Sequence, residues 1–170
     1  PLEIPVAHRL IARERLHGDA QVPPRHGDRI VIAQNSHLYG FANGEFGRVE
    51  SAGPAERRRV RGVDLVFRSA EIVVGGNEPR IQRVKLYDPL LQSPEPSLSP
   101  TEVSALYADF VIRNADIPRN SVEFAERLRL DRYFNALRVK YGWAVTCHKA
   151  QGGEWDSVFV EFENVHRSEA

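Results

Sequence analysis

The alternation of apolar and polar positions divides the chain into a helical start, a region of strands, a helical region and a final strand–loop–strand segment. In residues 4–16 apolar side chains recur at helical spacing, which predicts a short amphipathic helix. These side chains are Val6, Ala7, Leu10 and Ile11. The stretch HGDAQVPPRHGD that follows contains glycines and a double proline, which end the helix.

Between residues 28 and 87 the pattern changes to short extended runs rich in Val, Ile and Phe. The five runs are RIVIAQ (29–34), FGRVES (46–51), VDLVFR (63–68), EIVV (71–74) and IQRVKLY (81–87). Turn signals such as Asn43-Gly44 and Gly53-Pro54 separate some of them. Short strands at this spacing predict a small antiparallel barrel or sandwich.

A helical region follows the proline- and serine-rich connector DPLLQSPEPSLSP. Ser99, Pro100 and Glu102 have the spacing of a capped helix start, with the serine as N-cap and the glutamate as its capping-box partner. A second helix start is predicted at Asn120, with Glu123 as its partner. An apolar stripe predicts the core-facing side of the first of these helices. Its residues are Val103, Leu106, Tyr107, Phe110 and Val111.

The last part of the chain reads as strand, loop and strand. KYGWAVT and SVFVEF are apolar runs typical of strands that are buried on both faces of a parallel sheet. Between them, CHKAQGGEWD has room for one helical turn. Residues 140–162 therefore predict an α/β element that differs in kind from the barrel before it.

Composition narrows the classes of protein. Hydrophobic residues at 42% and charged residues at 27% match an ordinary soluble globular domain. Basic and acidic residues number 23 each, which argues against an independent nucleic-acid binder, although RRRVR at 57–61 is a local basic cluster. The sequence has no membrane-spanning run, and from the charged residues near its start we expect no signal peptide. With Cys147 as the single cysteine, we expect a cytoplasmic protein.

The polar junction between the last two runs could hold a ligand, because ligands gather where parallel strands end. Thr146, His148 and Lys149 could hold phosphate oxygens. Gly152 permits close approach of a ligand to the backbone, and Glu154 could accept from ribose hydroxyls. Each residue taken alone is more often structural, since isolated motif matches are weak.

Taken together, these residues resemble motif V of superfamily 1 DNA helicases of the RecD-like branch. A second stretch, GDRIVIAQNSHLYGFANGEFGRV at 27–49, is similar to the start of the SH3-like barrel inserted in the second motor domain of those helicases. The positions that fill the motif V pattern are Tyr141, Ala144, Thr146, His148, Lys149, Gln151, Gly152, Glu154, Trp155 and Asp156.

The resemblance implies a small SH3-like antiparallel barrel with a helical insertion, attached to a partial RecA-like parallel α/β lobe. The implied segments are an N-terminal helix and linker at 1–26, the barrel at 27–98, the insertion at 99–130 and the lobe segment with motif V at 131–170.

In function, the resemblance implies an ATP-dependent DNA helicase that moves 5′ to 3′, with ATP and Mg²⁺ bound in the intact parent protein. The chain has no G-x-x-x-x-G-K-(S/T) phosphate loop and no methionine. We therefore expect an inactive fragment that binds no cofactor alone and whose partners are single-stranded DNA and a missing N-terminal motor lobe. Exposed sheet edges would allow self-association. The implied contacts are Thr146, His148 and Lys149 for DNA, and Gln151, Gly152 and Glu154 for the nucleotide.

Two alternatives remain at the level of the sequence. A non-catalytic SH3-like module that binds single strands or a protein would also explain the barrel pattern and the zero net charge. A hydrolase that uses Cys147 and His148 is disfavoured, because adjacent residues on an extended strand point to opposite faces.

Overall fold

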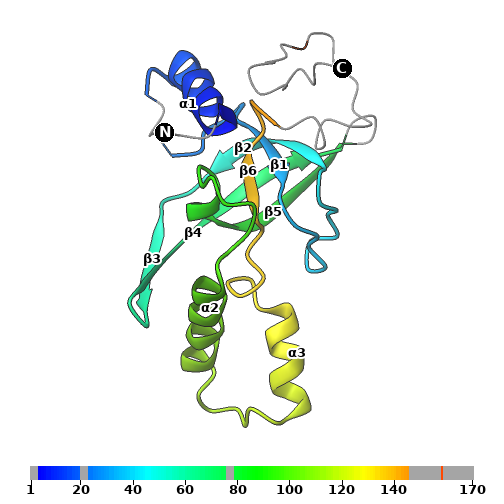
Figure 1. The fold of residues 1–170 in the computed structure, drawn as a ribbon. Coiled ribbons are helices and arrows are strands. Elements are labelled where there is room, and N and C mark those ends of the chain that lie inside the picture. The colour runs from blue at the N-terminus through cyan, green and yellow to red at the C-terminus, as the bar shows by residue number, and fades with distance from the viewer. Residues whose placement is uncertain (1–3, 20–22, 76–78, 146–157, 159–170) are drawn as a thin grey trace, which may run out of the picture.

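The computed structural model describes residues 4–19, 23–75, 79–145 and 158 (Figure 1). Within these residues no helix has the length and apolar character needed to cross a bilayer. The elements in chain order are α1 (Ile4–His17), β1 (Arg29–Ile32), β2 (Phe46–Ala52), β3 (Glu56–Val60), β4 (Val63–Val74), β5 (Arg80–Tyr87), the 3-10 helix η1 (Asp88–Leu90), α2 (Pro100–Arg113), α3 (Val122–Leu130) and β6 (Val139–Tyr141).

The strands form one curved antiparallel sheet in the order β3–β4–β2–β1–β6, with β5 paired to the other edge of β4. A parallel bridge between Leu86 and Leu137 joins the end of β5 to the segment before β6. There the Tyr87 amide donates to the Leu137 carbonyl at 3.1 Å, and the Leu137 amide donates to the Lys85 carbonyl at 2.6 Å. The sheet is therefore a half-barrel whose ends approach each other, which fits the predicted small barrel.

The strand pattern differs from the prediction in two places. The runs at 63–68 and 71–74 form a single strand, β4, because its pairing with β5 continues through Ser69 and Ala70 between them. The basic cluster at 57–61, which was not among the predicted strands, contributes most of strand β3. Its consecutive arginines hide the alternation, because Arg58 faces α2 while its neighbours face solvent.

The β6 segment is a correction. Val139–Tyr141 pairs antiparallel with β1, so the prediction of a strand in a parallel sheet is wrong for these residues. Burial on both faces has another cause here: Val139 and Tyr141 enter the barrel core, and the Lys140 ammonium is buried against backbone carbonyls of residues 93–95. Within the described part of the chain, all pairings between named strands are antiparallel.

The helical insertion begins as the sequence predicts. Ser99 accepts from the Glu102 amide at 3.2 Å, and Glu102 accepts in return from the Ser99 amide at 2.8 Å, so the capping box is confirmed. The second helix starts one residue later than predicted. Its N-cap is Ser121, not Asn120, and the Ser121 hydroxyl accepts from the Phe124 amide at 3.1 Å.

Three apolar clusters form the core. One fills the barrel, a second lies between β4 and α2, and a third joins α2 to α3. In the predicted stripe of α2, Leu106 and Phe110 are buried, whereas Val103 and Tyr107 remain 38% and 39% exposed. Figure 1 shows α2 and α3 together below the sheet and α1 at its opposite end. The insertion and α1 therefore pack against different ends of the barrel.

Candidate nucleic-acid and nucleotide site

The structure describes the entrance to the predicted site but not the site itself. All six predicted contact residues lie outside the described residues. They are Thr146, His148, Lys149, Gln151, Gly152 and Glu154. The described chain continues to Val145, directly before the predicted loop. The structure therefore shows which contacts fix residues 141–145, which lead into the loop.

Strand β6 leads into the predicted loop, and backbone hydrogen bonds fix its last residues. The Tyr141 amide donates to the Leu91 carbonyl at 3.2 Å, and the Gly142 amide donates to the Arg29 carbonyl at 2.8 Å. A side chain at Gly142 would place its Cβ 3.1 Å from the backbone of Ile30. Glycine therefore allows this close approach, which sets where the chain leaves the barrel.

Helix α1 grips the same segment through two buried arginines. Arg9 donates from Nε to the Ala144 carbonyl at 2.9 Å, and the Arg13 guanidinium lies 4.0 Å from the centre of the Tyr141 ring. Both arginines are buried, and Arg13 is fully enclosed. A helix near the start of the chain thus holds residues more than a hundred positions later.

Asp28 neutralises Arg13 inside this junction. The Arg13 guanidinium donates to both carboxylate oxygens at 3.2 and 3.3 Å, and His17 Nε2 lies 3.0 Å from Oδ1. Burial by itself would raise the pKa of Asp28. Hydrogen bonds from the Arg25 amide, Arg13 and His17 outweigh burial, so the pKa lies below its ordinary value. The carboxylate is therefore held in its charged form.

The sequence pattern did not predict this junction, because the apolar side of α1 was expected to be the side that packs. Ile11 is 48% exposed, whereas Arg9 and Arg13 are buried. The available signal was the spacing of Arg9, Arg13 and His17, which places one basic residue per helical turn on a single face. The predicted helix is confirmed, but its buried face is polar.

Trp143 fixes the segment before the loop to the barrel. Its ring packs against the barrel core and lies 5.7 Å from the Arg29 guanidinium. The indole Nε1 is buried and has no hydrogen-bond partner among residues placed by the structure. The entrance is thus held mainly by apolar and cation–π contacts on this side.

A second cluster of charges surrounds Tyr133, where the insertion meets the sheet. Arg58, Arg113 and Lys85 lie 3.9, 4.9 and 5.0 Å from the centre of its ring. Their carboxylate partners are Glu56, Asp109 and Asp131. Because each of these cations has a carboxylate partner among the described residues, the cluster fastens α2 to β3.

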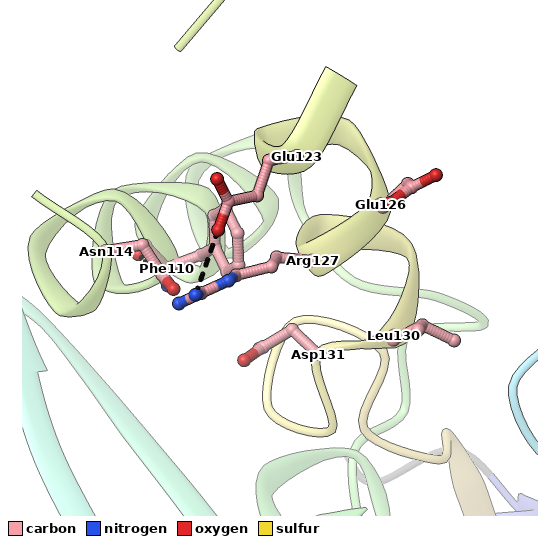
Figure 2. Close-up of a pocket in the computed structure, with 7 residues that line it drawn as sticks. All are labelled: Phe110, Asn114, Glu123, Glu126, Arg127, Leu130 and Asp131. Carbon is pink, nitrogen blue, oxygen red and sulfur yellow. Dashed lines mark hydrogen bonds and ion pairs between the residues drawn. The ribbon is translucent and has the colours of Figure 1, made fainter. Parts of the chain in front are cut away.

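A cavity of about 370 Å³ opens between α2 and α3 (Figure 2). Glu123 and Arg127 form an ion pair across one side of it at 3.0 Å, and Asp131 is bound to Arg113. The cavity therefore offers little uncommitted charge for chemistry. Its lining residues are Phe110, Asn114, Glu123, Glu126, Arg127, Leu130 and Asp131.

Acid is expected to destabilise the fold partly through Asp131. Burial would raise its pKa, but hydrogen bonds from Arg113 and from the Phe134 and Tyr133 amides hold the pKa below its ordinary value. The stabilisation is complete above the unfolded-state pKa of about 3.9 and is lost as the pH falls through the lower folded-state pKa. The urea midpoint should therefore fall more between neutral pH and about pH 3 in the wild type than in Asp131→Asn. Equal falls in both proteins would contradict this role.

Comparison with known families adds information about the C-terminal stretch. Residues 141–169 match the family model of the UvrD-like helicase C-terminal domain. No curated protein gave a significant match. The matched stretch begins at the last residue of β6 and includes all six predicted contact residues. It supports the C-terminal region of a superfamily 1 helicase and a helicase-family role.

Proposed function

We propose that this chain belongs to the second motor lobe of a RecD-like superfamily 1 DNA helicase that moves 5′ to 3′ on single-stranded DNA. One observation carries the proposal. The match at 141–169 coincides with the ordered motif V pattern from Tyr141 to Asp156. The antiparallel half-barrel is consistent with the SH3-like insertion of that branch.

In this proposal one short loop contacts two ligands. Thr146, His148 and Lys149 hold the DNA backbone, since hydroxyl, imidazole and ammonium groups all donate to phosphate oxygens. ATP and Mg²⁺ are bound together with a first motor lobe that supplies the phosphate loop. The residues that face the nucleotide are Gln151, Gly152 and Glu154.

The described entrance supports such a role in physical terms. A loop that couples two ligands needs a fixed base, so that a change at one ligand moves the loop at the other. Gly142 against Ile30 and Arg9 on Ala144 provide this base. The barrel and α1 therefore serve as the frame against which the loop works.

Two substitutions in the intact helicase test the proposal. Glu154→Ala should raise the KM for ATP about tenfold, because one hydrogen bond to a charged group is worth about 1.5–3 kcal/mol. Thr146→Ala should weaken single-strand binding about fivefold, since a neutral hydrogen bond contributes about 1 kcal/mol. Steady-state ATPase assays and fluorescence anisotropy measure the two effects.

The matched control is Glu126→Ala on α3, which removes an exposed carboxylate at a distance from the loop entrance. It should leave both quantities at the wild-type value. Wild-type KM and wild-type DNA affinity in Glu154→Ala and Thr146→Ala would show that the loop has been assigned wrongly.

The half-barrel itself favours a second candidate, a non-catalytic module that binds single strands or a protein. Its barrel core is formed within the described residues, and it includes Leu137, Val139 and Tyr141 from the segment predicted as the lobe. Tight binding of single-stranded DNA by this chain alone would favour the module. Binding that becomes tight only in the intact helicase would favour the motor.

A further inference from the structure

The hairpin formed by β3 and β4 extends beyond the rest of the sheet, alongside α2 (Figure 1). Val60 pairs with Val63, so the turn between the strands contains only Arg61 and Gly62. Their φ angles are +51° and +81°, the left-handed pair that matches the twist of a two-residue hairpin. The tip is therefore a tight turn that projects an arginine.

The two faces of the hairpin differ in what covers them. On the inner face Leu65 is fully buried, and Arg58 binds Asp109 of α2 at 2.8 Å. On the outer face Arg57 and Arg59 are exposed, opposite Val66 and Asp64 respectively. The helix thus anchors the hairpin from one side and leaves two arginines in solvent on the other.

The exposed arginines interact only weakly with other described side chains. Arg57 makes no hydrogen bond or ion pair with any residue that the structure describes. Arg59 lies 3.7 Å from Asp64, with the two side chains 73% and 67% exposed, so this pair is worth little. Arg61 is exposed, and among the residues that the structure describes it reaches only the Ser104 hydroxyl, at 3.4 Å. Each guanidinium can therefore take a new anionic partner at small cost.

Protection of an edge strand is the simpler explanation for charges on β3, because charged side chains prevent edge-to-edge pairing. Protection needs charge of either sign, and lysine is usual there. Here all three exposed side chains at positions 57, 59 and 61 are arginine. A single sign and a single residue type, in a chain with no net charge, indicate an anionic partner that guanidinium groups recognise.

We propose that the outer face of the β3–β4 hairpin, with Arg57, Arg59 and Arg61, binds the sugar–phosphate backbone of single-stranded DNA as a second contact outside the 146–156 loop. Arg57 and Arg59 are two residues apart on one strand, or about 6.6 Å from the strand rise, so they can reach different phosphates. The inference rests on the proposed function only for the identity of the polymer.

The test removes the three charges and measures salt dependence. Arg57, Arg59 and Arg61 are replaced together by glutamine, and binding of a labelled oligothymidylate to the 170-residue chain is followed by anisotropy from about 20 to 200 mM salt. Each lost phosphate contact should reduce the slope of log affinity against log salt by about 0.7, or about 2 for three contacts. In the wild-type chain, amide shifts in the NMR spectrum should change at residues 56–64 when the oligonucleotide is added.

A matched control carries the same loss of charge elsewhere on the barrel. Arg48, Arg80 and Arg83 are 56%, 55% and 86% exposed and each pairs with a glutamate. Replacing these three by glutamine should leave most of the slope intact. Equal slopes for the two triple variants, or no binding of the wild-type chain at the lowest salt, would overturn the proposal.

The result separates this inference from the assignment of the loop. Thr146→Ala removes no charge, so it should lower affinity without changing the slope. If Thr146→Ala binds with normal affinity and the triple glutamine variant of the hairpin has a reduced salt slope, the loop assignment alone is overturned. If Thr146→Ala binds with reduced affinity and the triple glutamine variant of the hairpin has the wild-type salt slope, the proposed hairpin contact alone is overturned.

Discussion

Replacing Asp28 with alanine is expected to lower the free energy of unfolding by about 3–5 kcal/mol, because it removes the carboxylate that neutralises the buried Arg13 guanidinium. Asp28 and Arg13 have fully buried side chains. Without the carboxylate, Arg13 keeps its hydrogen bond to the Pro23 carbonyl and its contact with the Tyr141 ring, and neither of these groups carries a negative charge. Urea unfolding followed by circular dichroism measures the loss.

Asp64→Ala is the matched control, since it removes one carboxylate from an exposed pair and should change stability by less than about 0.5 kcal/mol. Replacing both Arg13 and Asp28 with apolar residues of similar volume should recover much of the loss, because no unpaired charge remains. A loss below about 1 kcal/mol in Asp28→Ala would mean that the pair does not hold α1 on the barrel.

Phe67→Ala should cost about 3–5 kcal/mol, as is usual for truncating a buried phenylalanine. Phe67 is fully buried where the barrel, the hairpin and α2 meet. Its ring packs edge-on against Tyr87 and Tyr133, with centroids 5.8 and 5.1 Å away. The substitution leaves a cavity between β4 and the helical insertion, so both should loosen together.

The same urea titration tests this expectation, with Ile81→Ala on the neighbouring strand as control. Ile81 is 73% exposed, and its truncation should cost less than about 0.5 kcal/mol. If the two alanine variants unfold at the same urea concentration, the β4–α2 contact contributes little to the cooperative unit.

The two stability predictions concern opposite ends of the barrel. Asp28 fixes α1 against β6, and through Arg9 this contact reaches Ala144 at the mouth of the predicted loop. Phe67 fixes the insertion and the hairpin at the other end. Under the proposed function, Asp28→Ala should therefore disturb the loop more than Phe67→Ala at equal loss of stability.

Local sequence signals predicted the parts of the fold that depend on neighbours in the chain. The capping box at Ser99 follows from three adjacent positions, and the turn at Asn43-Gly44 is confirmed by the positive φ of Gly44. The resemblance of the last segment to a helicase motif is likewise a property of consecutive residues, and the family match covers the same stretch.

Pairing between distant segments had no such signal. An apolar run such as KYGWAVT can form a strand in a parallel sheet or in an antiparallel barrel. Only the pairing with β1 shows that Val139–Tyr141 is antiparallel. The buried side of α1 was also invisible, since Arg9 and Arg13 are charged in sequence and become inner residues only when Asp28 and the Ala144 carbonyl meet them.

The sequence by itself determined the start of α2, the start of α3 to within one residue, the turn at Asn43-Gly44 and the residues that carry the motif, because these depend on local backbone preferences and on residue order. The tertiary structure alone decided which strand β6 joins, which face of α1 is buried and that α2 covers one side of the hairpin. The physical reason is that each of these outcomes requires a partner far along the chain to remove a polar or apolar group from water.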